Sequence, residues 1–284
     1  MPFSNDPTID PLQSDPDLSS LTVIKYGGNA MTNADIRAEL IRQIKALYES
    51  GVRLVIVHGG GPFIKDTLQL AGIESRFIDG LRQTTSEAMP FVEMALRGRV
   101  NGELVRLLNA EGVPAVGLSG KDGMMARVKK RKLENRPDED LGQVGDVDKI
   151  DPELIHLLLK KGYIPVVAPI GLGTDGKDYN VNADIFAGHL AAAVQASRFV
   201  VLTDVDGLLK EPEDPKSLIS RMNLGDIDAQ MHQSIRGGMI PKIESCRVAV
   251  ESGVDRALIL NGKKPERLMD ALVRNKPTGT TISQ

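Results

Sequence analysis

The sequence predicts an α/β protein built on a mostly parallel β-sheet. Short apolar runs alternate with longer stretches in which apolar residues recur at helical spacing. Near the N-terminus this gives strand, helix, strand and helix in succession, an order typical of parallel sheets. The first two strands, around Val23 and at Leu54–His58, are each followed at once by glycines. Both glycine turns would lie at the edge of the sheet where open α/β proteins bind ligands.

Composition and charge exclude several classes of protein. The 284 residues include 41% hydrophobic side chains, enough to fill the core of one large or two medium domains. The net charge is −3 and the basic residues are scattered, so we expect no nucleic-acid partner. No apolar run reaches membrane-spanning length. The single cysteine, Cys246, excludes an internal disulfide and a cysteine-based zinc site, and it fits a reducing cytoplasm.

The N-terminal segment differs from the rest of the chain. Residues 1–20 are rich in Pro, Asp and Ser and poor in apolar side chains, so we expect a disordered arm. They contain no Lys or Arg, which argues against a signal or transit peptide. From the order of the elements alone, we expect one lobe over residues 21–195 and a second over residues 196–284.

Local signals place the elements of the first half. Thr32 and Asn33 can cap a helix that ends at Gly51, and Pro62 suits the first position of the next helix. Asp79–Gly80 is a hairpin signal. The expected elements are helices over residues 36–48, 62–71 and 86–109, strands over 53–57 and 115–118, and a hairpin within 74–83.

The second half continues the alternation. The basic run Lys129–Lys132 is followed closely by acidic residues, which favours a solvated hairpin or loop. Asp151 and Asn182 are suitable helix caps. The expected elements are helices over residues 151–162, 182–195, 223–234, 240–252 and 265–273, strands over 164–170, 199–202, 256–260 and 279–283, and a hairpin within 171–181.

The first glycine turn has the chemistry of an anion site. A short strand delivers Lys25, and Gly27 and Gly28 follow it shortly before a helix. Free N–H groups, the helix dipole and the lysine charge favour a phosphoryl group, which can approach the backbone closely at glycine. Taken alone, the motif fits an ordinary βα turn beside a surface lysine equally well.

Two later motifs strengthen the phosphate interpretation. Asn180, Asn182 and Asp184 place two amides and a carboxylate at a helix start, although capping by Asn182 would also explain them. Gly237–Gly238 again precedes a helix start and a lysine, Lys242, as a helix cap beside a surface lysine would. Two sites that combine glycines with a lysine in one chain favour phosphate binding.

Other site motifs are incomplete. Residues Gly171–Lys177 nearly match the P-loop motif. However, Asp178 occupies the position of the Ser or Thr that would hold Mg²⁺, and no helix follows. Ser119 misses the nucleophile-elbow pattern by one glycine, and no G-x-G-x-x-G follows a strand. The four histidines are dispersed, and a structural role explains His58 beside its glycines better than a place in the crevice.

Together the motifs resemble the amino acid kinase family. Each motif is common alone, but the set is specific, and it extends from about residue 21 to the end of the chain. The stretches are Ile24–Gly28, His58–Pro62, Gly80–Arg82, Asn180–Asp184, Thr203–Gly207, Gly238–Lys242 and Gly279–Ile282. The order of the motifs and the residues within them are similar to those of the branch that phosphorylates the γ-carboxylate of N-acetyl-L-glutamate in arginine synthesis.

The resemblance implies a three-layer αβα sandwich around a mostly parallel open sheet. The lobe 21–195 would bind N-acetyl-L-glutamate and form a homodimer, or part of a larger oligomer, and the lobe 196–284 would bind MgATP. The implied catalytic residues are Lys25, Lys242 and Asp184, and the implied substrate-binding residues are Gly60, Gly61, Arg82 and Asn180. The implied nucleotide- and phosphate-binding residues are Gly27, Gly28, Asp204, Val205, Asp206, Gly207, Leu208, Leu209, Gly237 and Gly238. No protein metal site is expected, because Mg²⁺ would be carried mainly by ATP.

The residues agree with this chemistry. A γ-carboxylate, with a pKa of about 4.3, is ionised at pH 7 and needs no general base. The reaction needs in-line positioning and relief of charge, and Arg82 suits an α-carboxylate through a bidentate fork. One departure is the proline-rich segment 1–20, which disfavours the N-terminal helix of arginine-inhibited relatives. Another is Gln83, because relatives often have Val at this position.

Two alternatives stay open. A sister kinase for another acylated amino acid, such as an N-acyl-aminoadipate, fits the same motifs, because one extra methylene changes selectivity by only about 1–3 kcal/mol. A catalytically inactive relative could sense an amino acid or a nucleotide through the same fold. The presence of Lys25, Asp184 and Lys242 disfavours the second alternative.

Overall fold

A single eight-stranded sheet forms the centre of the protein. The computed structural model describes residues 21–133, 135–211, 213–233 and 235–284, so the arm predicted for residues 1–20 lies outside the described residues. The strand order is β12-β14-β13-β11-β1-β2-β8-β5, and every neighbouring pair is parallel except β13 and β14. The predicted α/β class with a mostly parallel sheet is confirmed.

The strands follow the apolar runs of the sequence. Their bounds are β1 Thr22–Tyr26, β2 Leu54–His58, β5 Ala115–Ser119, β8 Ile164–Ala168, β11 Arg198–Thr203, β12 Arg221–Asn223, β13 Arg256–Asn261 and β14 Thr280–Ser283. The chain leaves β1 toward β2 on one side, whereas β11 pairs on the other side. The carboxyl ends of these three strands therefore meet at a topological switch point, where ligands bind in such sheets.

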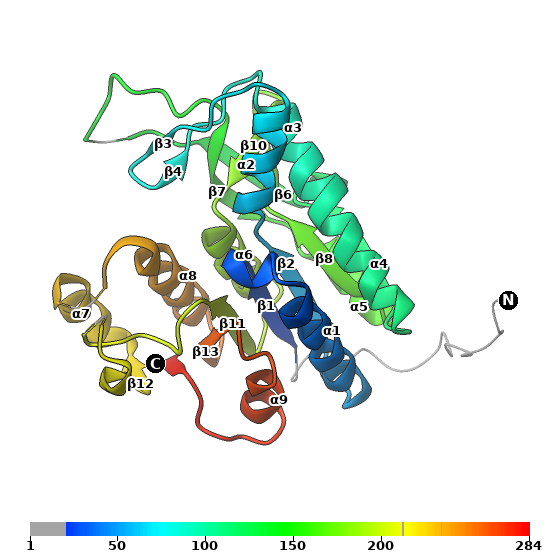
Figure 1. Ribbon diagram of the computed structural model, residues 1–284, viewed down its shortest axis with the longest axis vertical. Coiled ribbons are helices and arrows are strands. Elements are labelled where there is room, and N and C mark those ends of the chain that lie inside the picture. Colours follow the sequence, from blue (N-terminus) through cyan, green and yellow to red (C-terminus); the bar gives the residue numbers. More distant parts are fainter. Residues whose placement is uncertain (1–20, 134, 212, 234) are drawn as a thin grey trace, which may run out of the picture.

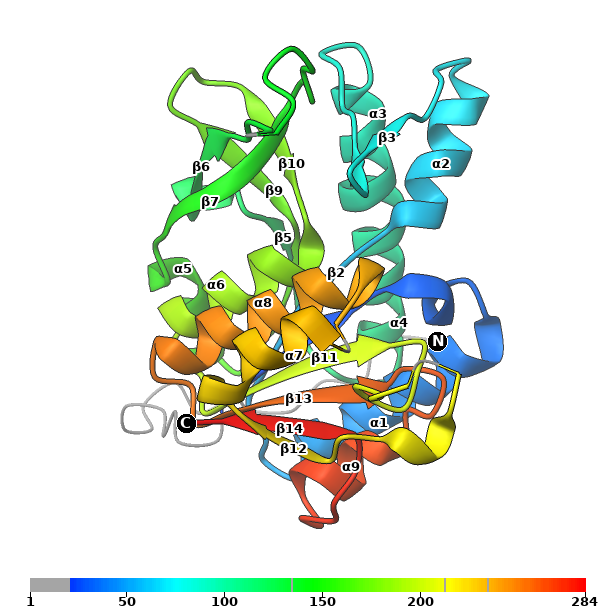
Figure 2. The same cartoon turned by 90° about the vertical axis from the view of Figure 1, so that its left-hand side faces the viewer.

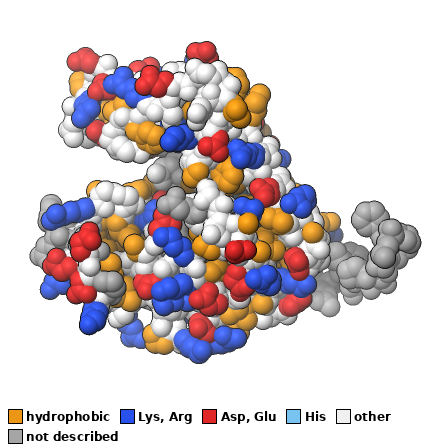
Figure 3. Space-filling model, viewed as in Figure 1, with side chains coloured by type: hydrophobic (Ala, Val, Ile, Leu, Met, Phe, Trp, Pro, Cys, Tyr) orange, Lys and Arg blue, Asp and Glu red, His pale blue; other side chains and the backbone are white. Residues whose placement is uncertain are grey.

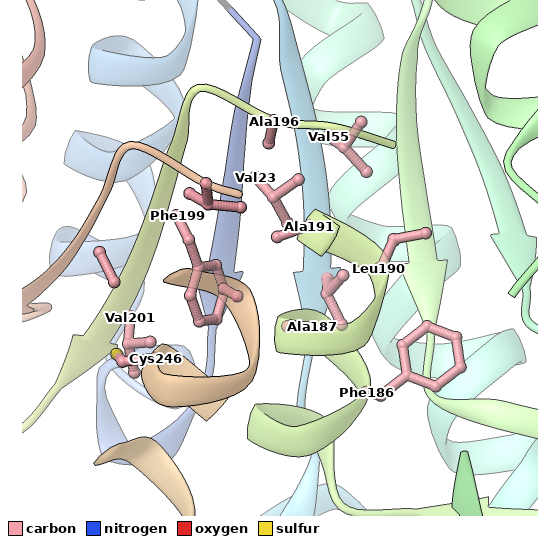
Figure 4. Packing of buried hydrophobic residues seen from close by; sticks show 14 of the residues in the cluster. Val23, Val55, Phe186, Ala187, Leu190, Ala191, Ala196, Phe199, Val201 and Cys246 are labelled. Atoms are coloured by element: carbon pink, nitrogen blue, oxygen red, sulfur yellow. The ribbon is translucent and has the colours of Figure 1, made fainter. Parts of the chain in front are cut away.

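Helices cover both faces of the sheet, which confirms the predicted three layers (Figures 1 and 2). One layer contains α1 Ala34–Glu49, α4 Gly102–Ala110 and α9 Arg267–Leu272. The other contains α5 Glu153–Lys160, α6 Ala183–Ala193 and α8 Ile240–Glu251. Alternate residues of a strand belong to opposite cores: Ile24 packs with the first layer, and Val23 packs with α6 residues such as Leu190 (Figure 4).

Smaller elements lie beyond the carboxyl ends of the strands. They are α2 Gly61–Leu70, the hairpin β3 Phe77–Ile78 and β4 Leu81–Arg82, α3 Met89–Glu93, and a closed barrel of β6 Ala126–Lys130, β7 Val144–Ile150, β9 Ile170–Gly173 and β10 Asp178–Val181. A second group, α7 Ile227–Gln233 and the N-terminus of α8, lies across from these elements. Figure 3 shows a hollow between these two groups.

Short helical turns connect several of these elements. They are η2 Gly28–Met31, η4 Asp122–Met124, η5 Pro215–Ser217, η6 Leu224–Asp226 and η7 Gly237–Met239. Two of them are glycine turns that the sequence predicted, η2 after β1 and η7 before α8. In both cases the glycine begins a 3₁₀ turn that precedes the α-helix.

Three local predictions differ from the structure. The helix predicted over residues 86–109 is continuous, but its middle is the π-helix η3 Met94–Asn101, which Gly98 does not interrupt. The strand predicted over 164–170 divides at Pro169 into β8 and β9, because proline cannot donate to the ladder. The basic run lies at the end of β6 and in the loop after it, within the predicted hairpin or loop. Strand β7 was not predicted, because three of its seven residues are charged.

Candidate active site

A cavity of about 260 Å³ opens at the carboxyl ends of β1 and β2. It lies in the hollow of Figure 3. The predicted site residues that line it are Lys25, Gly28, Gly60, Gly61, Arg82, Asn180 and Asp184. They come from four separate stretches of the chain, which the fold brings to one place.

The two glycine turns form one wall of the cavity. The N–H of Gly59 donates to the carbonyl of Tyr26 over 2.7 Å and joins the turns. A Cβ on Gly27 would lie 2.7 Å from Nζ of Lys25, so a larger residue there would displace the ammonium group from its position beside Asp184. At the second turn, α2 begins at Gly61 without a side-chain cap, and Pro62 follows. Its first N–H groups are therefore available to a bound anion.

Asp184 joins two lysines at the inner end of the cavity. One carboxylate oxygen lies 2.9 Å from Nζ of Lys25, and the other accepts a hydrogen bond from Nζ of Lys242 over 3.0 Å. The three side chains come from α6, β1 and α8, and all three are largely buried. Burial would raise the pKa of Asp184, but the charges of both lysines outweigh burial and hold the pKa below its usual value.

A helix cap fixes the position of this carboxylate. Oδ1 of Asn182 accepts from the N–H groups of Asp184 and Ile185 over 2.9 and 3.2 Å. Asp184 therefore stands in the first turn of α6, where the helix dipole also favours a negative charge. The cap predicted for Asn182 is confirmed.

Arg82 and Asn180 form the outer wall. The guanidinium of Arg82 donates to the carbonyl of Gly61 over 3.0 Å and lies 4.6 Å from the centre of the Phe77 ring. Burial lowers the pKa of Arg82. Nδ2 of Asn180 donates to Oγ1 of Thr84 over 3.3 Å. Both side chains are thus held by neighbouring protein groups beside the second glycine turn.

Other predicted nucleotide residues lie outside this cavity. Gly237 and Gly238 form η7 before α8, and the loop Asp204–Leu209 follows β11. Within that loop, Asp204 approaches the first glycine turn, since a Cβ on Gly28 would lie 3.2 Å from its Oδ1.

Two side chains of that loop face the protein. The carboxylate of Asp206 accepts from Nδ2 of Asn261 over 2.7 Å and from Nζ of Lys264 over 3.0 Å. These hydrogen bonds lower the pKa of Asp206. Leu208 is buried, and its N–H donates to Oγ1 of Thr280 over 2.8 Å. Asp206 and Leu208 therefore fix the shape of the loop, and Val205 between Asp204 and Asp206 is exposed.

Sequence analysis missed several lining residues. Phe77 could have been found, because a two-residue turn at Asp79–Gly80 places Phe77 opposite Arg82, as the structure has it. Leu96 and Val144 could not, because they belong to the π-helix and to β7, neither of which was predicted.

The site can hold two anions side by side. The lysine cluster and the Arg82 guanidinium both supply positive charge, and the start of α2 at Gly61, which has no side-chain cap, lines the same cavity. Among the described residues, no three His, Cys, Asp or Glu side chains are grouped so that they could hold a metal ion. No helix in the described ranges is both long and apolar enough to cross a membrane.

Comparisons with known proteins agree with this geometry. The sequence pattern of the amino acid kinase family matches residues 20–261. The chain is 42% identical to the acetylglutamate kinase of Archaeoglobus fulgidus over 93% of each chain, and 45% identical to that of Heliobacterium modesticaldum over 92% of this chain and 90% of the other. A solved structure from Streptococcus mutans UA159 covers 93% of this chain and 99% of its own, with a TM-score of 0.76 and 29% identity.

Proposed function

The chain belongs to the amino acid kinase family, and we propose that it transfers the γ-phosphoryl group of ATP to the γ-carboxylate of N-acetyl-L-glutamate. The product is N-acetyl-L-glutamyl 5-phosphate, an intermediate of arginine biosynthesis. Relatives at 42% and 45% identity over nearly the full length of both chains support this assignment. The structural observation that carries it is the buried Lys25–Asp184–Lys242 cluster at the end of a cavity that also contains Arg82.

The cluster suits phosphoryl transfer between two anions. The acceptor carboxylate is ionised at neutral pH, so no side chain has to remove a proton. Each lysine about 4 Å from a phosphoryl oxygen contributes roughly 4 kcal/mol of gross attraction at an effective dielectric constant near 20. Asp184 holds both ammonium groups in place and partly cancels their repulsion. Preorganised charge of this kind is the main catalytic device of phosphoryl transfer.

We assign the remaining site residues to the two substrates. Gly60, Gly61, Arg82 and Asn180 would bind the acyl amino acid, with Arg82 on its α-carboxylate. Gly27, Gly28, Gly237 and Gly238 would approach the phosphates, and residues 204–209 would line the nucleotide site. Bound Mg²⁺ would neutralise phosphate charge during transfer, and it would be carried mainly by the nucleotide.

The same proposal includes the larger organisation of the chain. Residues 21–195 would form the lobe for the acyl amino acid, and residues 196–284 the lobe for the nucleotide. We place a homodimer contact on the first lobe, where β5 is the last strand of the sheet. Met94, Met124 and Leu157 expose large apolar side chains on the elements around that strand. Such a group of exposed apolar residues is typical of a protein interface.

An assay of ADP release with purified protein tests the proposal. The acceptor panel is N-acetyl-L-glutamate, N-acetylaminoadipate, glutamate, aspartate and carbamate. We expect N-acetyl-L-glutamate to have the highest kcat/KM, and Arg82→Ala to raise the KM for the acceptor far more than the KM for ATP. A preference for N-acetylaminoadipate would identify a sister kinase. Turnover with none of these acceptors would contradict the proposed activity and leave the inactive relative as the alternative.

A further inference from the structure

His58 is fully buried directly beneath the second glycine turn. It is the last residue of β2, and Nδ1 lies 2.8 Å from the carbonyl oxygen of Gly59. Its Nε2 lies 3.0 Å from Nδ2 of Asn101, at the end of the π-helix η3. Both ring nitrogens of this histidine therefore have a protein partner.

Asn101 fixes which ring nitrogen carries the proton. Its Oδ1 accepts from the guanidinium of Arg97 over 3.0 Å, and its Nδ2 donates to the carbonyls of Val166 and Leu118 over 2.8 and 3.3 Å. The amide orientation is thus set by a donor on one side and a carbonyl acceptor on the other. The carbonyl of Gly59 can only accept, so the proton of the neutral ring is on Nδ1. Nε2 then faces Nδ2 of Asn101 as an acceptor, because the amide nitrogen cannot accept a hydrogen bond.

The protein has a fitted space for this amide. Asn101 occupies the place that a Cβ on Gly117 of β5 would need, so only glycine at that position admits it. Asn101 and Arg97 come from the π-helix, and such helices occur often at functional sites. The network continues from Arg97 to Asp122, whose carboxylate lies 3.6 Å from the guanidinium.

We propose that His58, held by Asn101, is a positioning residue that orients the Gly59–Gly60 peptide of the acceptor site. A trans peptide directs its C=O and N–H to opposite sides. Since His58 binds the C=O from within the protein, the N–H of Gly60 points away from His58, and Gly60 lines the cavity. A donor fixed in this way would bind an anionic oxygen of the acceptor. The inference rests on the proposed function, because it concerns the same site.

The surroundings of His58 keep it neutral. Burial lowers its pKa to about 4, although the bond to Gly59 opposes this effect. The charged group that faces it is Arg97 on the π-helix, with Asp122 behind it. On the other side, the phenol of Tyr26 stands on the neighbouring strand β1, and its hydroxyl donates to the carbonyl of Ala30. The packed segment of β8 contributes only apolar side chains.

Nitrogen-15 NMR of the imidazole tests the proton position directly and needs no activity. We expect His58 to be neutral, with the proton on Nδ1, from pH 8 down to about pH 5. The His58→Gln variant identifies its signals among the four histidines. A proton on Nε2, or protonation near pH 6.5, would overturn the proposal whether or not Asn101→Asp folds.

Asn101→Asp tests whether the proton position matters for the acceptor. A carboxylate at position 101 can only accept, so it would draw the single proton of a neutral His58 to Nε2. Nδ1 would then have no proton to donate to the carbonyl of Gly59. Only the doubly protonated ring can donate to both partners. At pH 8 we expect kcat/KM for the acceptor to fall by about 10²-fold, the scale of a misplaced reacting group. The ratio to wild type should recover as the pH falls to 6, while the KM for ATP changes little.

The control is His156→Gln. His156 also lies against a backbone carbonyl, that of Val194 at 3.3 Å, but it is remote from the cavity. It should keep the wild-type kcat/KM at each pH. If Asn101→Asp lost the same fraction of activity at every pH, the role of Asn101 would be purely structural and the proposal would be wrong. Failure of the proposed function would be recognised separately, as absence of turnover in the wild-type enzyme.

Discussion

At the residue scale, charge balance decides what the site can do. Lys25 and Lys242 would repel each other if nothing stood between their ammonium groups. Asp184 lies between them at 2.9 and 3.0 Å, so two positive charges and one negative charge share a largely buried space. The net positive charge that remains favours a phosphoryl group, and in the proposed mechanism the carboxylate positions the lysines and transfers no proton.

The lysines should therefore affect turnover more than ground-state binding. We expect Lys242→Met to lower kcat by about 10²–10³-fold, the cost of losing a comparable preorganised donor. The KM for ATP should change much less. Initial rates at saturating concentrations of both substrates measure this. Lys45→Met on α1 is the control, because Lys45 pairs with Glu111 at the surface and should keep wild-type kcat.

Asp184→Asn separates positioning from proton transfer. The two lysines hold the pKa of Asp184 below its usual value, so the carboxylate is ionised at every pH near neutrality. We expect the variant to be slower through misplaced lysines, with no new pH dependence of kcat between pH 6 and 8. A base-like pH profile that appears with this substitution would contradict the mechanism.

His58 should make stability depend on pH. Burial lowers its pKa from 6.5 to about 4, so between these values the unfolded chain binds a proton that the folded protein does not. The contribution of neutral His58 to the free energy of unfolding is fully present above pH 6.5. It is lost as the pH falls toward 4, by about 3 kcal/mol in total. Urea unfolding at several pH values measures the slope. His58→Gln should flatten it, and equal slopes for both proteins would refute the prediction.

At the element scale, two helices begin with the same kind of cap but differ in whether a site residue stands in their first turn. Oδ1 of Asn33 accepts from two N–H groups at the start of α1, as Oδ1 of Asn182 does at the start of α6. Only the second helix holds a site residue, Asp184, in its first turn. The pair therefore allows the structural effect of a cap to be separated from its effect on the site.

Replacing either cap with alanine should destabilise the protein by about 1 kcal/mol. Only Asn182→Ala should also lower kcat, because it loosens the turn that orients Asp184. Thermal unfolding and initial rates on the two variants measure the two effects. A similar loss of kcat in Asn33→Ala would mean that the effect is one of global stability.

At the scale of the whole molecule, the proposed dimer would protect an edge. β5 ends the sheet, so one side of the strand has no partner strand among the described residues. Met124 and Leu157 near it are 71% and 54% exposed. Pairing with a second copy would bury these side chains, whereas an open edge in a monomer promotes aggregation.

A charge at this surface should therefore dissociate the dimer. We expect the double variant Met124→Asp and Leu157→Asp to be a monomer by light scattering, because a carboxylate is costly to bury at an interface. Leu70→Asp on α2 is the matched control, since Leu70 is 87% exposed and lies apart from β5. An unchanged mass of the double variant would place the contact elsewhere, and a monomeric wild-type protein would refute the dimer.

The sequence by itself determined the fold class and most elements, because those signals are local. Alternation of apolar runs, the caps at Asn33 and Asn182, and the glycines after β1 and β2 act within a few residues. The family also followed from the sequence, because the order of its motifs is specific. The functions of the site residues are still predictions, although the fold brings Lys25, Arg82, Asn180 and Asp184 to one cavity.

Only the tertiary structure decided the features that depend on distant partners. The π-helix η3 forms where Asn101 reaches between β5 and β8 to His58, a contact that no local pattern encodes. Strand β7 has three charged residues among seven and is a strand because it belongs to a closed barrel. Sequence spacing also left open how Asp206 is used, because its partners Asn261 and Lys264 lie far along the chain. Long-range packing sets such contacts, and a sequence window cannot contain both partners.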